Sequence, residues 1–258
     1  MAGVSFDRAA DYYDETRALP GEAADAVTAI LAAELAGRRP ALEVGVGTGR
    51  MALPLHALGL GMLGVDISMP MLRRLRSNPG GGGFPVALAD ATQLPFPGHS
   101  VGATVASHVL HLIPEWRQAV EEVVRVTRPG GALLVDVGGN SGAALDSPWR
   151  QATDAIMVEH GLSRARPGVR RSEDIAEALG GRASVRQLAP VRMTAHRSLA
   201  QDLDAWQNQV NSWTWRYRAE EIAGACEDVH RWADTQGWPL DESVALDRVI
   251  QWWAFDLT

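Results

Sequence analysis

Residues 41–50 (ALEVGVGTGR) place Gly45, Gly47 and Gly49 directly after a short apolar run. Glycine tolerates positive φ and has no Cβ, so the backbone of such a segment can approach a ligand closely. Nicotinamide and flavin proteins carry a similar Gly-rich turn, but their fingerprint requires a third glycine where this chain has Arg50. Glu43 adds a carboxylate that would repel a pyrophosphate and suit a cation. The segment therefore favours a cationic ligand over a dinucleotide.

Asp66 comes at the end of the next apolar run, 61–65. An acidic residue at such a strand end can accept hydrogen bonds from both hydroxyls of a ribose. The alternative is an aspartate that caps the turn before Ser68. On the ribose interpretation the side chain faces a ligand crevice, so we expect its truncation to weaken ligand binding and to change the stability of the fold little.

Asp90 ends a third apolar run, 85–89, and is followed by Ala91. A carboxylate there can accept a hydrogen bond from an adenine amino group, while a neighbouring backbone N–H meets a ring nitrogen. The alternative is an aspartate that only shapes a turn. Three successive apolar runs thus end in the groups that adenosine with a cationic tail requires.

His108 and His111 follow the apolar segment 101–107 in the turn SHVLH. Their spacing of three residues can put both imidazoles on one side of a helical turn. Histidine titrates near neutral pH, and His108 is our candidate general base, whereas His111 is our candidate ligand contact. The alternative is that one or both only hydrogen-bond the backbone or the ligand. No carboxylate or third ligand lies at a recognisable spacing, so we expect no metal site.

Tryptophans gather in the C-terminal half, at Trp206, Trp213 and Trp215. They could line an apolar acceptor pocket or hold a cation against their π faces. The alternative is the ordinary packing of a lid. Cys226 recurs at helical spacing with Ile222, and we interpret it as a packing residue.

These residues need elements that bring their segments together. Between residues 40 and 137, short apolar runs alternate with amphipathic stretches, which is typical of βα units and a parallel sheet. The ligand crevice of such a sheet lies at the carboxyl ends of its strands. We expect Ser68 to cap a helix that extends to about Arg76. Strands are predicted over 41–46, 61–65, 85–89, 101–107 and 132–137.

The pattern changes after residue 140. Helices are predicted over 147–161 and 172–179, a strand over 184–194, and a helix that opens with a capping box at Ser198. A strand-like run, 244–257, ends the chain. We expect one domain over residues 1–258, with a core over 1–140 and helical lid insertions over 141–182 and 198–241.

The charge and composition exclude several function classes. The chain has 258 residues, a formal net charge of −7 and a single cysteine. A nucleic-acid modifier would usually carry a basic face, and a membrane span would need roughly 18 apolar residues in a row, so we expect neither partner. One cysteine permits no internal disulfide, and the start lacks the pattern of a secretory signal, so we expect a cytoplasmic protein. The sequence does not indicate an oligomeric state.

Residues 40–137 resemble the class I S-adenosylmethionine-dependent methyltransferases, in the branch that includes quinone-biosynthesis enzymes. The resemblance is carried by the segments ALEVGVGTGR, GVDIS, ALADATQLPFPGHSV and RVTRPGGALLVD, and the opening FDRAADYYDETR resembles that branch's N-terminal helix. It implies an α/β, Rossmann-like fold: a doubly wound, mostly parallel seven-stranded sheet with an antiparallel last strand and helical lid insertions. It also implies S-adenosylmethionine as cofactor, S-adenosylhomocysteine as product, and acceptor recognition beyond residue 140.

The resemblance also assigns cofactor contacts. It places Glu43 and the three glycines against the methionine part, and Asp66 on the ribose with Ile67 beside the adenine. Asp90 and Ala91 would read the adenine edge. The remaining implied contacts are Tyr13, Arg17, Ser107 and His111.

Two functions from different classes remain open. The first is an enzyme that methylates a small molecule on oxygen, nitrogen or carbon. The second is a protein of the same fold that binds S-adenosylmethionine without methylating anything, since fold alone does not decide function.

Overall fold

The computed structural model describes residues 5–138 and 147–258 of the chain. The chain divides into two compact units. Unit 1 comprises Met1–Gly138, Pro167–Val191 and Ile250–Thr258, and unit 2 comprises Gly139–Arg166 and Arg192–Val249. The expected insertion 141–182 is therefore divided at Pro167, and its C-terminal part belongs to unit 1.

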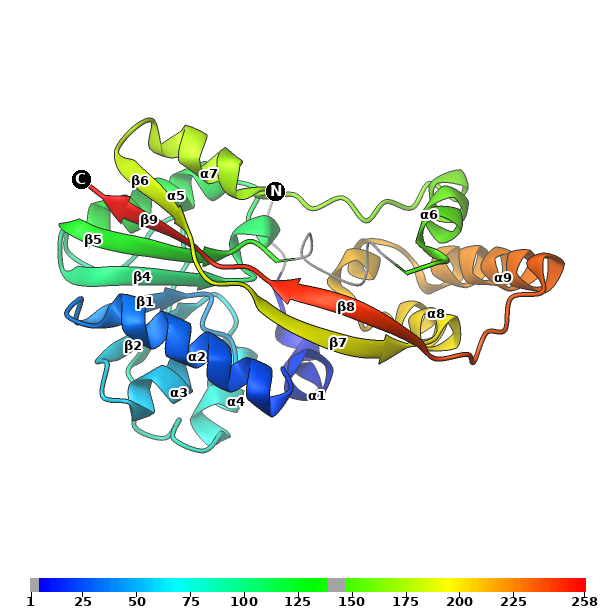
Figure 1. The fold of residues 1–258 in the computed structure, drawn as a ribbon, viewed down its shortest axis with the longest axis horizontal. Helices are drawn as coiled ribbons and strands as arrows, with labels where there is room; N and C mark the ends of the chain where they lie inside the picture. Colours follow the sequence, from blue (N-terminus) through cyan, green and yellow to red (C-terminus); the bar gives the residue numbers. More distant parts are fainter. Residues whose placement is uncertain (1–4, 139–146) are drawn as a thin grey trace. The chain divides into compact units, whose positions relative to one another are not determined.

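Within the described residues, seven strands form the sheet of unit 1 in the order β3-β2-β1-β4-β5-β9-β6 (Figure 1). Strands β1 to β5 pair in parallel, whereas β9 runs antiparallel to both β5 and β6. The predicted doubly wound sheet with an antiparallel last strand is confirmed. The bounds are β1 Ala41–Val44, β2 Met62–Asp66, β3 Val86–Leu88, β4 Val101–Ser107, β5 Thr127–Asp136, β6 Ala183–Gln187 and β9 Trp253–Leu257.

The central strands owe their position to uninterrupted apolar runs. Every residue of β1 and β4 is buried, as expected for parallel strands covered by helices on both faces. The register pairs Val44 with Val65, and Asp66 with Leu88. Residues that follow β1, β2 and β3 therefore meet at one edge of the sheet.

Helices cover both faces of this sheet (Figure 1). In α5, the buried residues Trp116, Ala119, Val120, Val123 and Val126 recur every three or four positions, which is the spacing of one helical face, and they join the core cluster of the sheet. The helices of unit 1 are η1 Asp7–Ala9, α1 Tyr13–Arg17, α2 Gly21–Leu35, α3 Ala52–Ala57, α4 Met69–Ser77, η2 Leu110–Leu112, α5 Trp116–Val126 and α7 Ser172–Leu179.

Both predicted helix caps are confirmed. The Ser68 hydroxyl accepts a hydrogen bond from the backbone N–H of Met71 at 3.3 Å and fixes the start of α4. Ser198 and Gln201 form the reciprocal capping box of α8, with distances of 3.2 and 3.0 Å. Each cap pairs N–H groups that the first helical turn leaves without a partner.

The prediction of one strand over 184–194 and one over 244–257 is wrong, because the structure has two strands in each range. Strands β6 and β9 belong to the large sheet, whereas β7 (Val191–Arg197) and β8 (Val244–Ile250) form a separate pair. Pro190, just before β7, has no N–H for a ladder bond. Gln251 lies in the opposite interruption, and its Nε2 donates to the carbonyls of Leu188 and Trp252 at 2.8 Å each. The Gln251 side chain thus supplies a hydrogen-bond donor to backbone carbonyls at the point where the strand ladder is interrupted.

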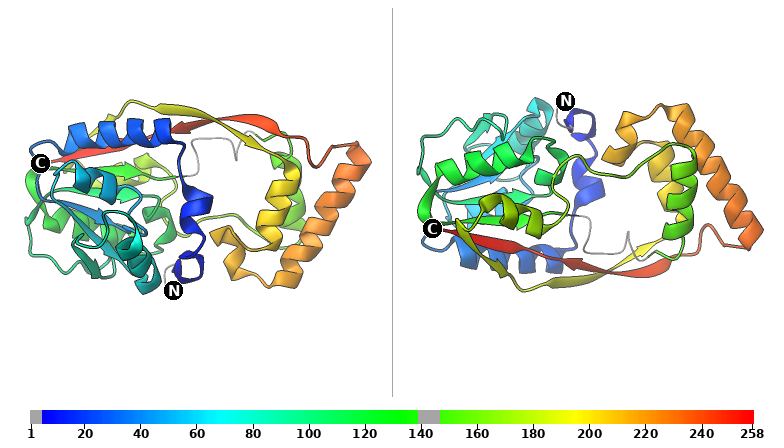
Figure 2. Two further views of the ribbon diagram at one scale, coloured as in Figure 1. Left: turned by 90° about the horizontal axis from the view of Figure 1, so that it is seen from below. Right: turned by 90° about the horizontal axis from the view of Figure 1, so that it is seen from above.

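Unit 2 has its own apolar core. Helices α6 (Arg150–Glu159), α8 (Leu199–Gln207) and α9 (Ala219–Gln236) lie side by side (Figure 2), joined by η3 (Ser212–Arg216). Their buried residues include Trp149, Leu203 and Cys226. Cys226 is the packing residue that the sequence predicts, and burial raises the pKa of its thiol to about 11.

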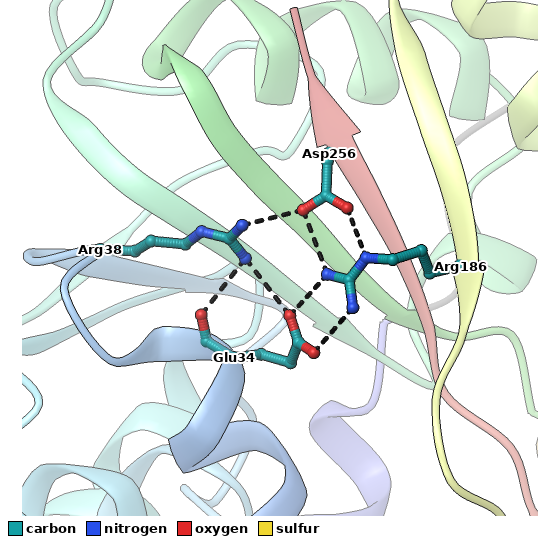
Figure 3. A network of polar contacts seen from close by, with 4 residues as sticks. All are labelled: Glu34, Arg38, Arg186 and Asp256. Atoms are coloured by element: carbon teal, nitrogen blue, oxygen red, sulfur yellow. Dashed lines mark hydrogen bonds and ion pairs between the residues drawn. The ribbon is translucent and has the colours of Figure 1, made fainter.

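Four charged residues tie helix α2 to strands β6 and β9 (Figure 3). The Arg186 guanidinium contacts Glu34 at 2.8 Å and Asp256 at 2.6 Å, and Arg38 bridges the same two carboxylates at 3.3 and 2.9 Å. Hydrogen bonds from Arg186 lower the pKa of both carboxyl groups. Because those values are lowered, the stabilisation is present at neutral pH and is lost as the pH falls through them.

We expect Arg186→Ala to lower the free energy of unfolding by about 1 kcal/mol at neutral pH and low salt. The effect stays this small because 45% of the Arg186 side chain is exposed. It should shrink in high salt and below about pH 3, where the carboxylates are protonated. Urea denaturation measures it. The matched control is Arg182→Ala, whose ion-pair partner Glu121 is 54% exposed, and it should cost less. Equal losses for the two variants would show that the four residues do not act as a network.

Candidate functional site

A pocket opens at the carboxyl ends of β1 to β4, entirely within unit 1. Nine of the residues that the sequence assigns to a cofactor or to catalysis line it: Tyr13, Gly45, Gly47, Asp66, Ile67, Asp90, Ala91, Ser107 and His108. The other lining residues are Phe6, Val44, Val65, Met71, Ala89, Thr92, Val109, Leu112, Ile113 and Glu115. The fold thus collects side chains and backbone from four strand ends around one cavity.

The glycine turn is shaped by backbone conformations that favour glycine. Gly45, Gly47 and Gly49 have φ values of 69°, 54° and 88°. A Cβ on Gly45 would come within 2.5 Å of Val109, and one on Gly49 within 2.6 Å of Leu53. Gly45 and Gly47 line the pocket, whereas Gly49 lets the turn pack against helix α3.

Asp66 makes the turn contacts of the capping alternative and also lines the pocket. Its Oδ1 accepts the Ser68 N–H and its Oδ2 accepts the Gly47 N–H, both at 2.8 Å, and the side chain still lines the pocket. Burial raises the pKa of Asp66, and the hydrogen bonds from the N–H groups of Ser68 and Gly47 oppose this rise. The carboxylate therefore joins the glycine turn to the start of α4. Because two backbone donors would lose their acceptor, we now expect truncation of Asp66 to destabilise the fold, in place of the small change expected from the sequence.

Glu43 is a buried carboxyl group behind the glycine turn. Only 2% of the residue is exposed, and in the described part of the chain Oε2 has no hydrogen-bond partner. Burial raises its pKa to about 8, and Asp66 adds to the rise while Arg50 and the Ala52 N–H oppose it. A buried acid with an unsatisfied oxygen is suited to pair with a cation.

Asp90 follows β3 and forms a turn. Its Oδ1 accepts hydrogen bonds from the backbone N–H and the hydroxyl of Thr92, both at 2.8 Å. This is the turn geometry that the sequence offers as the alternative for Asp90. Asp90, Ala91 and Thr92 all line the pocket, with Ile67 beside them at the end of β2. Ile67 is 53% exposed, so it offers an apolar surface to a ligand.

The N-terminal segment reaches the pocket through Phe6 and Tyr13, whose rings meet edge to face at 5.8 Å between centroids. Asp14 anchors it: its Oδ1 accepts the Thr48 hydroxyl at 2.5 Å, and its Oδ2 accepts Asn78 Nδ2 at 3.1 Å. Asp14 was not predicted from the sequence, because its partners lie more than 30 residues away. Arg17 is not among the lining residues, and its carbonyl accepts Arg50 Nη1 at 2.8 Å.

His108 lies after β4 with φ of 52° and faces the same pocket. Its Nε2 is 2.8 Å from Oδ2 of Asp136, the last residue of β5, which is only 4% exposed. His111 is buried, its ring centroid is 6.3 Å from that of His108, and it is not among the lining residues. Ser107 accepts a long hydrogen bond from Arg50 at 3.5 Å. Among the described residues, no three His, Cys, Asp or Glu side chains are grouped to hold a metal.

Asp136 is a site residue that the sequence did not predict, although one signal was available. Asp136 is the last residue of an apolar strand, as Asp66 is, and Asp90 follows shortly after another apolar strand. The partner of His108 became visible only when β4 and β5 were placed side by side, where Ser107 pairs with Asp136.

Two of the three tryptophans expected to bind an acceptor, Trp206 and Trp213, face a cation of the chain itself. In unit 2, the Arg164 guanidinium lies 4.4 Å from the Trp206 ring centroid and 5.2 Å from that of Trp213. Trp206 is buried, and Trp215 donates its indole N–H to the Gln209 carbonyl at 2.7 Å. Burial lowers the pKa of Arg164 to about 10. The packing alternative thus describes Trp206, and the cation over its π face is Arg164.

Comparison with known proteins finds a family match within the core of the chain. Residues 42–135 match the family described as "Methyltransferase domain". The phosphatidylethanolamine N-methyltransferase of Cereibacter sphaeroides is 38% identical over 98 residues, 36% of this chain and 48% of that protein. The demethylmenaquinone methyltransferase of Renibacterium salmoninarum is 30% identical over 175 residues, 67% of this chain and 62% of that protein. The matched region thus spans less than two thirds of either relative.

The fold is shared with solved structures over a larger part of the chain. The YcgJ protein of Bacillus subtilis superimposes with a TM-score of 0.55 at 17% identity, covering 89% of this chain and 99% of that one. At this identity the likeness shows the fold, and together with the matching family it confirms the resemblance to class I S-adenosylmethionine-dependent methyltransferases.

Proposed function

We propose, from the match of residues 42–135 to the methyltransferase-domain family, that the chain transfers the methyl group of S-adenosylmethionine to a small-molecule acceptor. The observation that carries the proposal is the composition of one pocket. The glycine turn, Asp66 with Ile67, and Asp90 with Ala91 come from three separate strand ends and line the same cavity. A ligand with an adenine, a ribose and a cationic tail would use all three.

The residues present suit the parts of this cofactor. Asp66 has lone pairs left beside its two backbone bonds and can accept from ribose hydroxyls. Ile67 offers an apolar face to the adenine, and Asp90 an acceptor to its amino group. Buried Glu43, with Oε2 unpaired among the described residues, lies behind the turn that would meet the methionine part, and it would supply negative charge there on ionisation. Tyr13 lines the pocket from the N-terminal segment.

S-adenosylmethionine supplies an electrophilic methyl group on a sulfonium, and its positive charge disappears as the methyl leaves. The protein's task is therefore to align an acceptor with the methyl and to exclude water. The apolar lining residues Val109, Leu112 and Ile113, together with Phe6, provide water-excluding walls. No charged group needs to stabilise a developing anion in such a displacement.

The acceptor is a small molecule in our proposal. The relatives' names cite acceptors as different as phosphatidylethanolamine and demethylmenaquinone, so the shared domain does not select one. Unit 2 lies entirely outside the matched residues 42–135, and we assign acceptor recognition to it, including the expected contribution of Trp213 and Trp215. The net charge of −7 disfavours a nucleic acid. The single cysteine supports a cytoplasmic location. In the described ranges, no helix is long and apolar enough to cross a bilayer.

An acceptor screen tests the proposed activity. The protein is incubated with methyl-labelled S-adenosylmethionine and a panel of phenols, carboxylic acids, primary amines and tertiary amines. The proposal expects label in at least one acceptor, with one S-adenosylhomocysteine released per methyl transferred. Saturable binding of S-adenosylhomocysteine without any transfer, either to the panel or to the small-molecule fraction of a cell extract, would instead support the non-methylating alternative.

A further inference from the structure

The pocket contains an imidazole in an unusual backbone conformation. His108 is one of three non-glycine residues in the described chain with positive φ, at 52°. This region is sterically unfavourable for a residue with a Cβ, and it persists where surrounding contacts enforce it. Here the enforcing contact is the backbone N–H of His108, which donates to the Asp136 carbonyl at 3.0 Å. The conformation places the ring at the pocket wall, with 42% of the side chain exposed.

Asp136 holds that ring by one nitrogen. Its Oδ2 lies 2.8 Å from His108 Nε2, and its Oδ1 accepts the Gly138 N–H at 2.9 Å. Although burial opposes ionisation, the interaction with His108 and the Gly138 N–H lower the pKa of Asp136. An ionised carboxylate only accepts hydrogen bonds, so Nε2 must carry the proton. The neutral ring then keeps its lone pair on Nδ1.

Gly138 leaves room for the ring. It has φ of 63°, and a Cβ at this position would lie 3.0 Å from His108 Nδ1 and 3.2 Å from its Cγ. The chain therefore combines three features at the end of β5 and β4: a buried acid, a left-handed histidine and a glycine packed against the imidazole. A histidine that only packed against Gly138 would not require the buried carboxylate of Asp136 as a partner.

We propose that His108 is the general base of the methyl transfer, that Asp136 is its positioning residue, and that the acceptor therefore carries a proton on the atom to be methylated, as an O–H or N–H group. This inference rests on the proposed methyltransferase function. His108 Nδ1 takes the proton from the acceptor as the new bond to the methyl carbon forms. The electron pair of the broken carbon–sulfur bond stays on sulfur, which becomes a neutral thioether. The imidazolium, paired with Asp136, then loses its proton to water.

Other charged groups surround the pair and bear on its titration. Arg50 lies near Asp136 and contributes to lowering its pKa. His111 is the neighbouring ring on η2, and Glu115 lines the same pocket beyond it. The proposed tests therefore measure the tautomer of His108 and compare the change in kcat with the change in acceptor KM, rather than relying on a pH optimum alone.

The first test reads the tautomer by nitrogen-15 NMR of the full chain with S-adenosylhomocysteine, with His108→Gln to assign the signal. The proposal expects the proton on Nε2 and a free lone pair on Nδ1. Asp136→Asn should remove this preference, because an amide can turn its NH2 toward the ring. A proton on Nδ1 in the parent protein would overturn the proposal, since that atom could not accept another.

The second test measures transfer to the same panel of phenols, carboxylic acids, primary amines and tertiary amines. His108→Gln should lower turnover of proton-bearing acceptors by about 10²- to 10⁴-fold, the usual contribution of a general base. Asp136→Asn should lower kcat by about 10²-fold with the acceptor KM within about threefold of the parent, because Asp136 acts through the ring. Calorimetry should show unchanged S-adenosylhomocysteine binding in both variants.

His99→Gln is the matched control. His99 also has positive φ, at 55°, and its Nδ1 lies 3.1 Å from the Thr127 carbonyl, but it does not line the pocket. It should leave transfer unchanged. Equal turnover by His108→Gln and the parent would overturn the proposed base while leaving the methyltransferase function standing. A parent protein that binds no S-adenosylhomocysteine would overturn the function itself.

Discussion

Asp66→Ala is expected to weaken S-adenosylhomocysteine binding by about 10²- to 10³-fold, a loss of about 3–4 kcal/mol. The reason is that a ribose with two hydroxyls would lose two hydrogen bonds to a charged group, each contributing about 1.5–3 kcal/mol, while water partly refills the gap. Asp66→Asn should fall between Ala and the parent, because the amide keeps one acceptor oxygen and loses the charge.

The same substitution should also destabilise the ligand-free protein, because Asp66 accepts the backbone N–H groups of Gly47 and Ser68. Asp174→Ala is the matched control: Asp174 accepts the backbone N–H groups of Arg170 and Arg171 at 3.0 Å each and lies outside the pocket. Both Ala variants should melt at lower temperature, but only Asp66→Ala should lose ligand affinity. Calorimetric titration and thermal melts measure the two effects. Parent-like affinity in a folded Asp66→Ala would refute the ribose assignment.

Glu43→Gln is expected to stabilise the ligand-free protein at pH 8 by about 3–5 kcal/mol. Burial raises the pKa of Glu43 from 4.5 to about 8, and a tenfold change in an acid dissociation constant corresponds to about 1.4 kcal/mol. Between these two pH values the unfolded chain releases the Glu43 proton and the folded chain keeps it. The parent therefore loses stability as the pH rises from about 4.5 to 8, and a neutral glutamine does not.

Thermal melts from about pH 4.5 to 8.5 measure this effect. The two proteins should melt alike near pH 4.5, and the variant should melt at least about 6 °C higher near pH 8. An exposed glutamate supplies the control: Glu159→Gln should not change the pH dependence. A constant difference between parent and Glu43→Gln at all pH values would show that Glu43 does not titrate in this range.

Folding of the free protein favours protonated Glu43, whereas cofactor binding should favour its ionised form. If a cation pairs with Glu43, binding at pH 7 requires its ionisation, and up to one proton should be released per bound S-adenosylhomocysteine. Calorimetry in two buffers of different ionisation enthalpy counts that proton, and Glu43→Gln should release none and bind more weakly. Stability given up in the free protein would thus be recovered in the complex, a pattern common at binding sites.

The parallel core could be predicted from the sequence because its signals are local. The apolar run of β4 was predicted with the bounds that the structure shows, and Ser68 caps α4 through a residue only three positions away. Asp66 was recognisable for the same reason: an acid directly after an apolar strand lies at the ligand edge of a parallel sheet.

What could not be predicted depends on pairs that are distant in the chain. Asp136 orients His108 only because β4 and β5 are neighbours. Asp14 meets Thr48 across an intervening helix and strand. Arg164 fills the space over Trp206 that a ligand cation could have taken, because a tryptophan cluster in sequence does not reveal which cation it faces. Gly49 looked like its two neighbours in the turn but serves packing against Leu53.

Every proposal above depends on the pocket of unit 1 binding S-adenosylmethionine as a methyl donor. The decisive measurement is calorimetric titration of the unmodified protein with S-adenosylhomocysteine, and separately with NAD⁺. We predict saturable binding of one S-adenosylhomocysteine per chain and no binding of NAD⁺. Binding of NAD⁺, or no heat from S-adenosylhomocysteine with the protein folded, would contradict this assignment.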